Sequence, residues 1–131
     1  MNSPKQIAMV GFALGALAVA LGAFGAHYFK ALLVFNNRMD TYELAVRYHF
    51  YHALALPALA SFFHLANKRA ITWSAWLITI GVTLFSGSLY VLAILDYRAV
   101  VIITPIGGVA MVVGWVTGLW ALHKGKNVVG K

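Results

Sequence analysis

Three histidines are the residues of this chain whose type and spacing best suit ligand binding. His49 and His52 stand three positions apart, so a helix places them on one face. His27 closes the apolar segment that precedes them. Three imidazoles suit Zn²⁺ or Cu²⁺, and two can ligate a haem iron. The alternative is that each imidazole hydrogen-bonds to a neighbouring helix and fixes its register.

Other polar side chains accompany the histidines. Glu43 and Arg47 are four positions apart with the acid first, the better order for an ion pair on a helix, although such a pair can also mark only a helix start. Further polar residues come from two later segments: Ser86, Ser88, Tyr90 and Thr104. The sequence has no Ser-His-Asp arrangement with a usable acid, no HExxH motif and no Walker loop. These absences argue against enzymatic activity without excluding it, and we expect no catalytic residue, no resident cofactor and no bound metal.

The composition indicates which solvent surrounds these residues. Of 131 residues, 62% are hydrophobic and 10% are charged, whereas soluble domains carry about 25% charged residues. A chain this short cannot bury so much apolar surface in water, so lipid is its natural solvent. The net charge of +7 comes from basic residues between apolar segments. This arrangement favours contact with membrane lipids and not with nucleic acid. The absence of cysteine excludes disulfides, thiolate metal sites and cysteine nucleophiles.

Four segments approach the roughly 20 apolar residues that a membrane-spanning helix needs: 7–28, 42–65, 71–95 and 100–122. They predict a single all-α domain over residues 1–131, a four-helix transmembrane bundle with up-down-up-down topology. The connection between the first two segments has a short apolar stretch, expected to lie along the outer interface. Basic residues without acids gather on one side of the membrane: Lys5, Lys68, Arg69, Lys124, Lys126 and Lys131. The positive-inside rule then places both termini in the cytoplasm.

This threading brings the polar side chains to one depth, in the outer half of the membrane. Polar groups inside a membrane are costly unless they are paired or hydrated. We therefore predict an outward-facing polar pocket with these candidate residues: His27, Glu43, Arg47, His49, His52, Ser86, Ser88, Tyr90 and Thr104.

Small residues repeat along the first and last segments at alternating spacings of three and four. The first stripe is Ala8, Gly11, Gly15, Ala18, Gly22 and Gly25, and the second is Gly107, Ala110, Gly114, Thr117 and Ala121. Such stripes let helix backbones approach closely in lipid. We predict that these two segments pack on each other, within the bundle or across a dimer, and we expect a homo-oligomer or a partner membrane protein. Pro57, inside the second segment, favours a kink.

Four short motifs together resemble a known family. They are Leu21-Gly22-Ala23-Phe24-Gly25-Ala26-His27, Tyr48-His49-Phe50-Tyr51-His52-Ala53-Leu54-Ala55-Leu56, Leu84-Phe85-Ser86-Gly87-Ser88-Leu89-Tyr90, and Thr104-Pro105-Ile106-Gly107-Gly108 followed by Gly114-Trp115. In this order they resemble the bacterial membrane family called domain of unknown function 423, which is related to the animal transmembrane protein 256 group. The resemblance implies a small multi-pass protein of the bacterial inner membrane without an established activity. It also implies that glutamine is common where this chain has His49.

These observations favour a non-enzymatic binding, scaffold or accessory protein of the membrane. An oligomeric transporter or channel is the second interpretation, since one four-helix unit is small for a solute pathway. A histidine-ligated haem or metal redox protein is the third.

Overall fold

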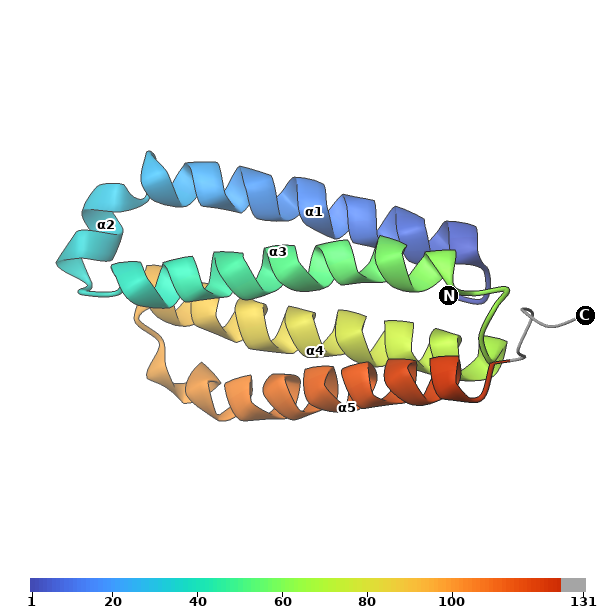
Figure 1. The fold of residues 1–131 in the computed structure, drawn as a ribbon. Coiled ribbons are helices and arrows are strands. Elements are labelled where there is room, and N and C mark those ends of the chain that lie inside the picture. Colours follow the sequence, from blue (N-terminus) through green and yellow to red (C-terminus); the bar gives the residue numbers. More distant parts are fainter. Residues whose placement is uncertain (126–131) are drawn as a thin grey trace, which may run out of the picture.

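Helices account for all the regular structure in residues 1–125, the part of the chain that the computed structural model describes. The long helices are α1 (Pro4–Ala26), α3 (Met39–Ser61), α4 (Lys68–Leu95) and α5 (Thr104–His123), and the short elements are α2 (Lys30–Phe35) and the 3-10 turn η1 (Arg98–Ile102). Figure 1 shows the long helices side by side in alternating directions, with α2 at one end. The prediction of an all-α fold is confirmed, and no predicted segment end lies more than four residues from its helix end.

Local sequence signals set several of these boundaries. The Ser3 side chain accepts a hydrogen bond from the Gln6 amide at the start of α1, where Pro4 suits the first helical turn. The Asn67 side chain caps α4 in the same way. The residue that caps the C-terminus of α4 is Asp96, whose φ of 47° is left-handed. The apolar stretch predicted to lie along the outer interface folds as α2.

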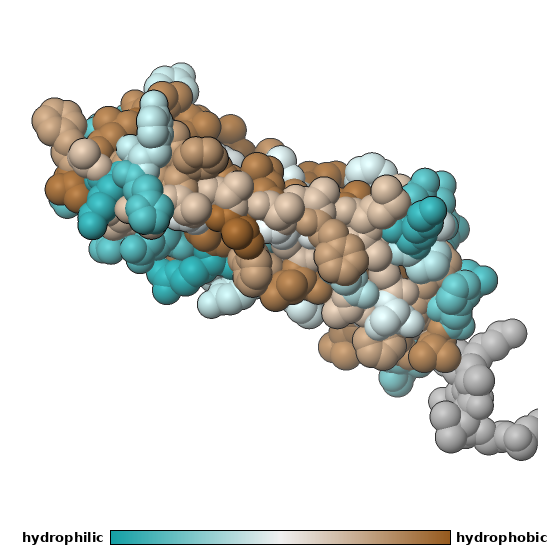
Figure 2. Space-filling view, turned by 90° about the horizontal axis from the view of Figure 1, so that it is seen from above, coloured by the Kyte–Doolittle hydropathy of each residue, from teal (hydrophilic) through white to brown (hydrophobic). Residues whose placement is uncertain are grey.

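Three helical segments are long and apolar enough to cross a bilayer: Pro4–Ala26, Lys68–Leu95 and Arg98–His123. The space-filling view supports this reading, because brown and pale apolar surface occupies the middle of the molecule and teal polar surface gathers at both ends (Figure 2). The helix α3 is as long as α1 but is more polar, since it carries Glu43, Arg47, His49 and His52.

The long helices form a row in which each packs on its neighbour in sequence. The principal contacts join α1 to α3, α3 to α4, and α4 to α5. Within the described residues α1 and α5 do not form a packed pair, so the predicted contact between these two helices inside one chain is wrong. A contact between them across a dimer stays a prediction. Helices α1 and α5 do not pack on each other within one chain because each small-residue stripe already faces another helix. The stripe of α1 faces α3, and the stripe of α5 faces α4.

Glycines allow the closest approaches in this row. A Cβ atom on Gly11 would lie 2.8 Å from the Ala53 carbonyl oxygen of α3, and one on Gly107 would lie 2.5 Å from the Phe85 amide nitrogen of α4. Gly25 faces the Tyr42 ring, and Gly114 faces Ile78 at 2.8 Å. Gly15 and Gly22 are less crowded, with nearest atoms at 3.9 and 3.4 Å. All the predicted packing glycines therefore face a neighbouring helix, four of them at close contact.

The proline of α3 lies against one of these glycines. Pro57 has no amide hydrogen, so the carbonyl of Ala53 lacks its usual helical donor. A Cβ on Gly11 would approach both this carbonyl and the Pro57 ring, at 2.8 and 2.5 Å. The Cα of Gly11 therefore approaches the orphaned carbonyl, where a Cα–H can serve as a weak donor.

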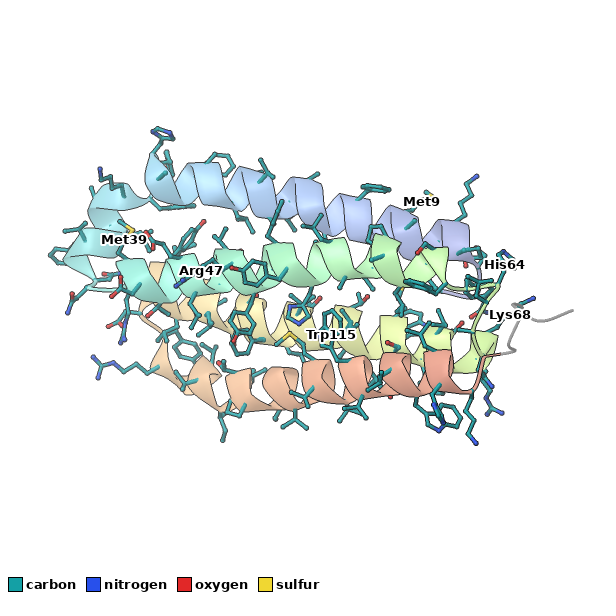
Figure 3. The ribbon with its side chains drawn as sticks, viewed as in Figure 1. Met9, Met39, Arg47, His64, Lys68 and Trp115 are labelled. Atoms are coloured by element: carbon teal, nitrogen blue, oxygen red, sulfur yellow. The ribbon has the colours of Figure 1, made fainter. Side chains whose placement is uncertain are left out.

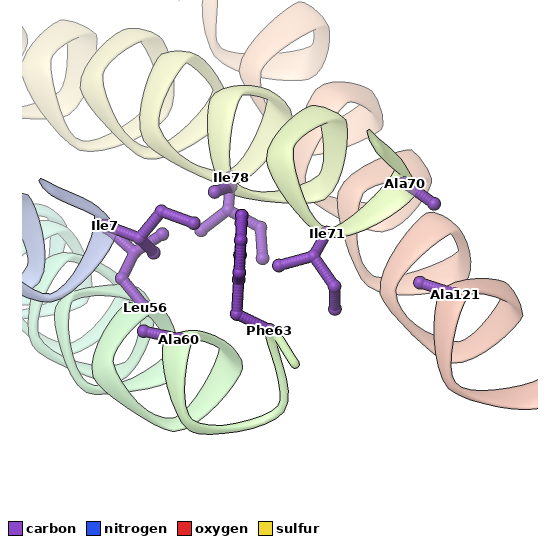
Figure 4. Close-up of a cluster of buried hydrophobic side chains, with 9 residues drawn as sticks. Ile7, Leu56, Ala60, Phe63, Ala70, Ile71, Ile78 and Ala121 are labelled. Atoms are coloured by element: carbon purple, nitrogen blue, oxygen red, sulfur yellow. The ribbon is translucent and has the colours of Figure 1, made fainter. Parts of the chain in front are cut away.

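The largest cluster of buried apolar side chains lies toward the end that carries the N-terminus. Figure 4 shows Phe63 between Ile71, Ile78 and Leu56. This end carries four basic residues in the described chain, Lys5, Lys68, Arg69 and Lys124. The remaining predicted basic residues, Lys126 and Lys131, lie outside the described residues.

Candidate functional site

The structure distributes the predicted pocket residues over several places. His49 and His52 are both buried in α3, with 5% and 7% of their surface exposed. Their rings nevertheless meet different neighbours, because His49 contacts Tyr90 of α4 and His52 contacts Trp115 of α5. The predicted residues therefore do not surround one common space.

The His52 ring is fully hydrogen-bonded. Its Nδ1 donates to the carbonyl oxygen of Tyr48 at 2.7 Å, one turn earlier in α3. Its Nε2 accepts a hydrogen bond from the Trp115 indole Nε1 at 3.3 Å. Figure 3 shows Trp115 midway along the helices, where the neutral imidazole ties α3 to α5. No nitrogen of His52 is left for a metal or a haem iron.

Another polar contact, between Ser88 and Thr104, joins α4 to α5. The hydroxyl oxygens of Ser88 and Thr104 lie 2.7 Å apart, and Ser88 also donates to the Phe85 carbonyl oxygen. Both hydroxyls are therefore used to hold the start of α5 on α4.

His27 lies exposed at the C-terminal cap of α1. No three His, Asp or Glu side chains in residues 1–125 are arranged to hold a metal ion. The three-imidazole site considered from the sequence therefore does not form in this arrangement.

Glu43 and Arg47 are exposed and line a shallow groove between α1 and α3. Figure 3 shows Arg47 toward the α2 end of the row. The predicted ion pair between these side chains is wrong. The ion pairs found among the described residues join Asp96 to Arg38 at 3.1 Å and to Arg98 at 3.9 Å. The Arg38–Asp96 ion pair therefore joins the residue just before α3 to the residue just after α4, at the α2 end of the molecule.

The remaining predicted residues form the candidate site. His49, Ser86 and Tyr90 line a cavity of about 160 Å³ between α1 and α4, with α3 at its base. The His49 Nδ1 lies 3.3 Å from the Tyr90 hydroxyl. Two buried atoms, the His49 Nε2 and the Ser86 Oγ, have no hydrogen-bond partner in the structure. Such atoms are uncommon in folded proteins, because an unpaired buried polar group is costly.

Other residues of this cavity were not identified from the sequence: Leu14, Leu17, Leu21, Val82, Thr83 and Gly87. The three leucines form one wall from α1, at spacings of three and four. That spacing is a signal for one helix face, but in a membrane helix it does not distinguish a cavity wall from a lipid-facing surface. The cavity is therefore mostly apolar, with its polar atoms contributed by α3 and α4.

The fold identifies the class of protein to which this chain belongs. A helical chain with three described segments able to cross a bilayer is an integral membrane protein. The chain belongs to the family described as "Protein of unknown function (DUF423)", whose model matches residues 21–108. The family membership predicted from the four motifs is thus confirmed.

Curated relatives agree with this assignment. The UPF0382 membrane protein YwdK of Bacillus subtilis (strain 168) is 38% identical over 116 residues, which cover 86% of this chain and 91% of the relative. A UPF0382 membrane protein of Haemophilus influenzae is 36% identical over 125 residues, covering 95% and 98%. The UPF0382 inner membrane protein YgdD of Escherichia coli (strain K12) is 38% identical over 105 residues, covering 77% and 76%. The predicted place in a bacterial inner membrane is confirmed by these relatives and by the apolar helices. No solved structure matches the chain at a significant level.

Proposed function

We propose that this protein is a non-enzymatic binding protein of the inner membrane, which holds a small lipid-soluble molecule in the cavity between α1 and α4. The observation that carries the proposal is the pair of unpartnered buried atoms, His49 Nε2 and Ser86 Oγ, beside an otherwise apolar cavity. A molecule that fills the cavity and pairs these atoms removes their desolvation cost.

The position of the cavity along the helices sets the route of entry. Its walls run from Leu14 to Leu21 in α1 and from Val82 to Tyr90 in α4. These stretches lie inside the apolar segments, away from both polar ends. Leu17 is 50% exposed, so this wall also faces the surroundings of the helix row. A ligand therefore enters sideways from lipid, in place of the outward-facing entry expected from the sequence.

The same proposal makes α3 the fourth membrane span. With 23 residues it is long enough, and its two histidines point at neighbouring helices instead of lipid. Glu43 and Arg47 lie within its first turns, where long side chains reach the interface. Basic residues without acids at the other end then favour a cytoplasmic location for both termini.

Filling the cavity tests the proposal. Gly87 lines the cavity, and a Cβ on it would meet no atom within 4 Å, so Gly87→Leu adds a side chain at the cavity wall without a clash at its Cβ. Gly87→Ala is the matched control, because it adds one methyl group and leaves most of the space. The probes are duroquinone and dioctanoyl phosphatidylglycerol, added to protein in dodecyl maltoside.

We expect at least one probe at saturation to raise the Tm of the wild type and of Gly87→Ala by about 4 °C or more, and to leave Gly87→Leu unchanged. Tryptophan fluorescence during heating measures these values. If neither probe stabilises the wild type, or if Gly87→Leu gains as much stability as Gly87→Ala, the proposed function is wrong.

A further inference from the structure

We infer that the ligand of the α1–α4 cavity carries a carbonyl group, which accepts hydrogen bonds from both His49 and Ser86. This inference rests on the proposed function and identifies the chemistry of the bound molecule. It follows from the direction of the hydrogen bonds at His49, from the walls of the cavity and from its volume.

The Tyr90 hydroxyl fixes the tautomer of His49. A phenol has one hydrogen to donate, and within residues 1–125 the hydrogen-bond partner of the Tyr90 hydroxyl is the His49 Nδ1, at 3.3 Å. When the phenol donates to Nδ1, its hydrogen is used and the imidazole proton must sit on Nε2. With the opposite tautomer, the phenol hydrogen would be left without an acceptor. Satisfying both groups therefore makes the unpartnered His49 Nε2 a donor.

The second unpartnered atom has matching properties. The Ser86 Oγ is buried, with 2% of the residue exposed, and it carries a hydroxyl hydrogen. Ser86 and Tyr90 stand four positions apart in α4, so they lie on the same helix face as the cavity. A carbonyl oxygen has two lone pairs and can accept two hydrogen bonds at once. A hydrocarbon would leave both donors unpaired.

The remaining walls and the volume restrict the size of the ligand. The cavity of about 160 Å³ is lined by apolar side chains apart from His49, Thr83, Ser86 and Tyr90. A cavity near 150 Å³ accepts a benzene-sized ring in another protein. Two membrane components present a carbonyl at this scale: the ring of a quinone and the ester of an acyl lipid.

Duroquinone and durene form a matched pair of probes. They share one tetramethylated ring, and only the quinone has carbonyl groups. Dioctanoyl phosphatidylglycerol supplies the ester source, and each probe is titrated against the full-length protein in dodecyl maltoside. The variants are Ser86→Ala, which removes one donor, His49→Leu, which removes the other, and His49→Gln, whose side-chain amide still donates.

The expected result is that a carbonyl probe binds at least tenfold more tightly than durene. Ser86→Ala and His49→Leu should each weaken its binding by about three- to tenfold, and His49→Gln should restore most of the loss. The carbonyl stretching band of the bound probe should lie at lower frequency in the wild type than in Ser86→Ala. Binding of duroquinone alone assigns the site to a quinone ring, and binding of the phospholipid alone assigns it to an acyl ester.

Equal affinity for durene and duroquinone, with both blocked by Gly87→Leu, would overturn the carbonyl inference and leave the proposed function intact. Absence of binding by every probe would overturn both, and would leave ordered water as the partner of the two donors. Ser86→Ala supplies a separate control on folding. Because it removes an unpaired buried hydroxyl, the variant without ligand should melt no lower than the wild type.

Discussion

Replacing Gly107 with alanine should loosen the pair formed by α4 and α5. A Cβ at this position would stand 2.5 Å from the Phe85 amide nitrogen, 2.7 Å from the Gly81 carbonyl oxygen and 2.9 Å from the Phe85 Cα. All three are backbone atoms, so no side chain can rotate away. Ordinary contact starts near 3.4 Å, and α5 must therefore retreat by roughly 1 Å along this stretch.

The expected cost follows from this displacement. Overpacking in a close-packed interface destabilises by about 1–3 kcal/mol, and the better helix propensity of alanine offsets at most about 1 kcal/mol. We expect a net loss of about 1–2 kcal/mol. Gly108→Ala is the matched control: it makes the same change one residue later, where the nearest atom is a ring carbon of Phe85 at 3.8 Å. Its stability should stay equal to that of the wild type or rise slightly.

Unfolding by SDS in dodecyl maltoside micelles, followed by tryptophan fluorescence, measures both variants against the wild type. Equal stability of Gly107→Ala and Gly108→Ala would refute the argument, because the two differ only in whether the new methyl group meets backbone.

Three further predictions concern other contacts. Ser74→Ala removes a buried hydrogen bond of 2.7 Å to the Gly114 carbonyl oxygen, and the same SDS titration should report a loss of about 0.6–1.7 kcal/mol; a gain would contradict the pairing. Arg38→Ala breaks the ion pair with Asp96, whose side chains are 27% and 42% exposed, so the loss should not exceed about 1 kcal/mol and should shrink in 0.5 M NaCl. An unchanged loss at high salt would show that charge attraction is not its cause. Alkaline phosphatase fused after Lys124 should be inactive in cells and active when inserted after Asp96, because only the second site faces the periplasm under the proposed topology; the reverse pattern would invert the orientation.

The positions of the helices could be predicted from the sequence more fully than the question of which helix packs against which. Long apolar runs and the capping residues Ser3 and Asn67 locate the helices because these signals act within one segment. The stripe around Gly107 predicts that a backbone approaches, but it does not identify which one. That backbone belongs to Gly81 and Phe85 of α4.

The candidate site was predictable in part for a similar reason. Three residues along a helix rotate a side chain by about 300°, so His49 and His52 point about 60° apart. That angle keeps them on one side of α3, yet in this row it directs His49 to α4 and His52 to α5. The sequence predicts that buried polar residues need partners, but Tyr90 and Trp115 could be assigned to them only once the helix order was known.

The missing hydrogen bond at Pro57 makes α3 easiest to bend beside Ala53, and α1 lies against that point through Gly11. One turn further along α1, Leu14 begins the wall of the cavity. If α1 moves to admit a ligand as proposed, the movement also removes a neighbour from the stretch of α3 that lacks a helical hydrogen bond.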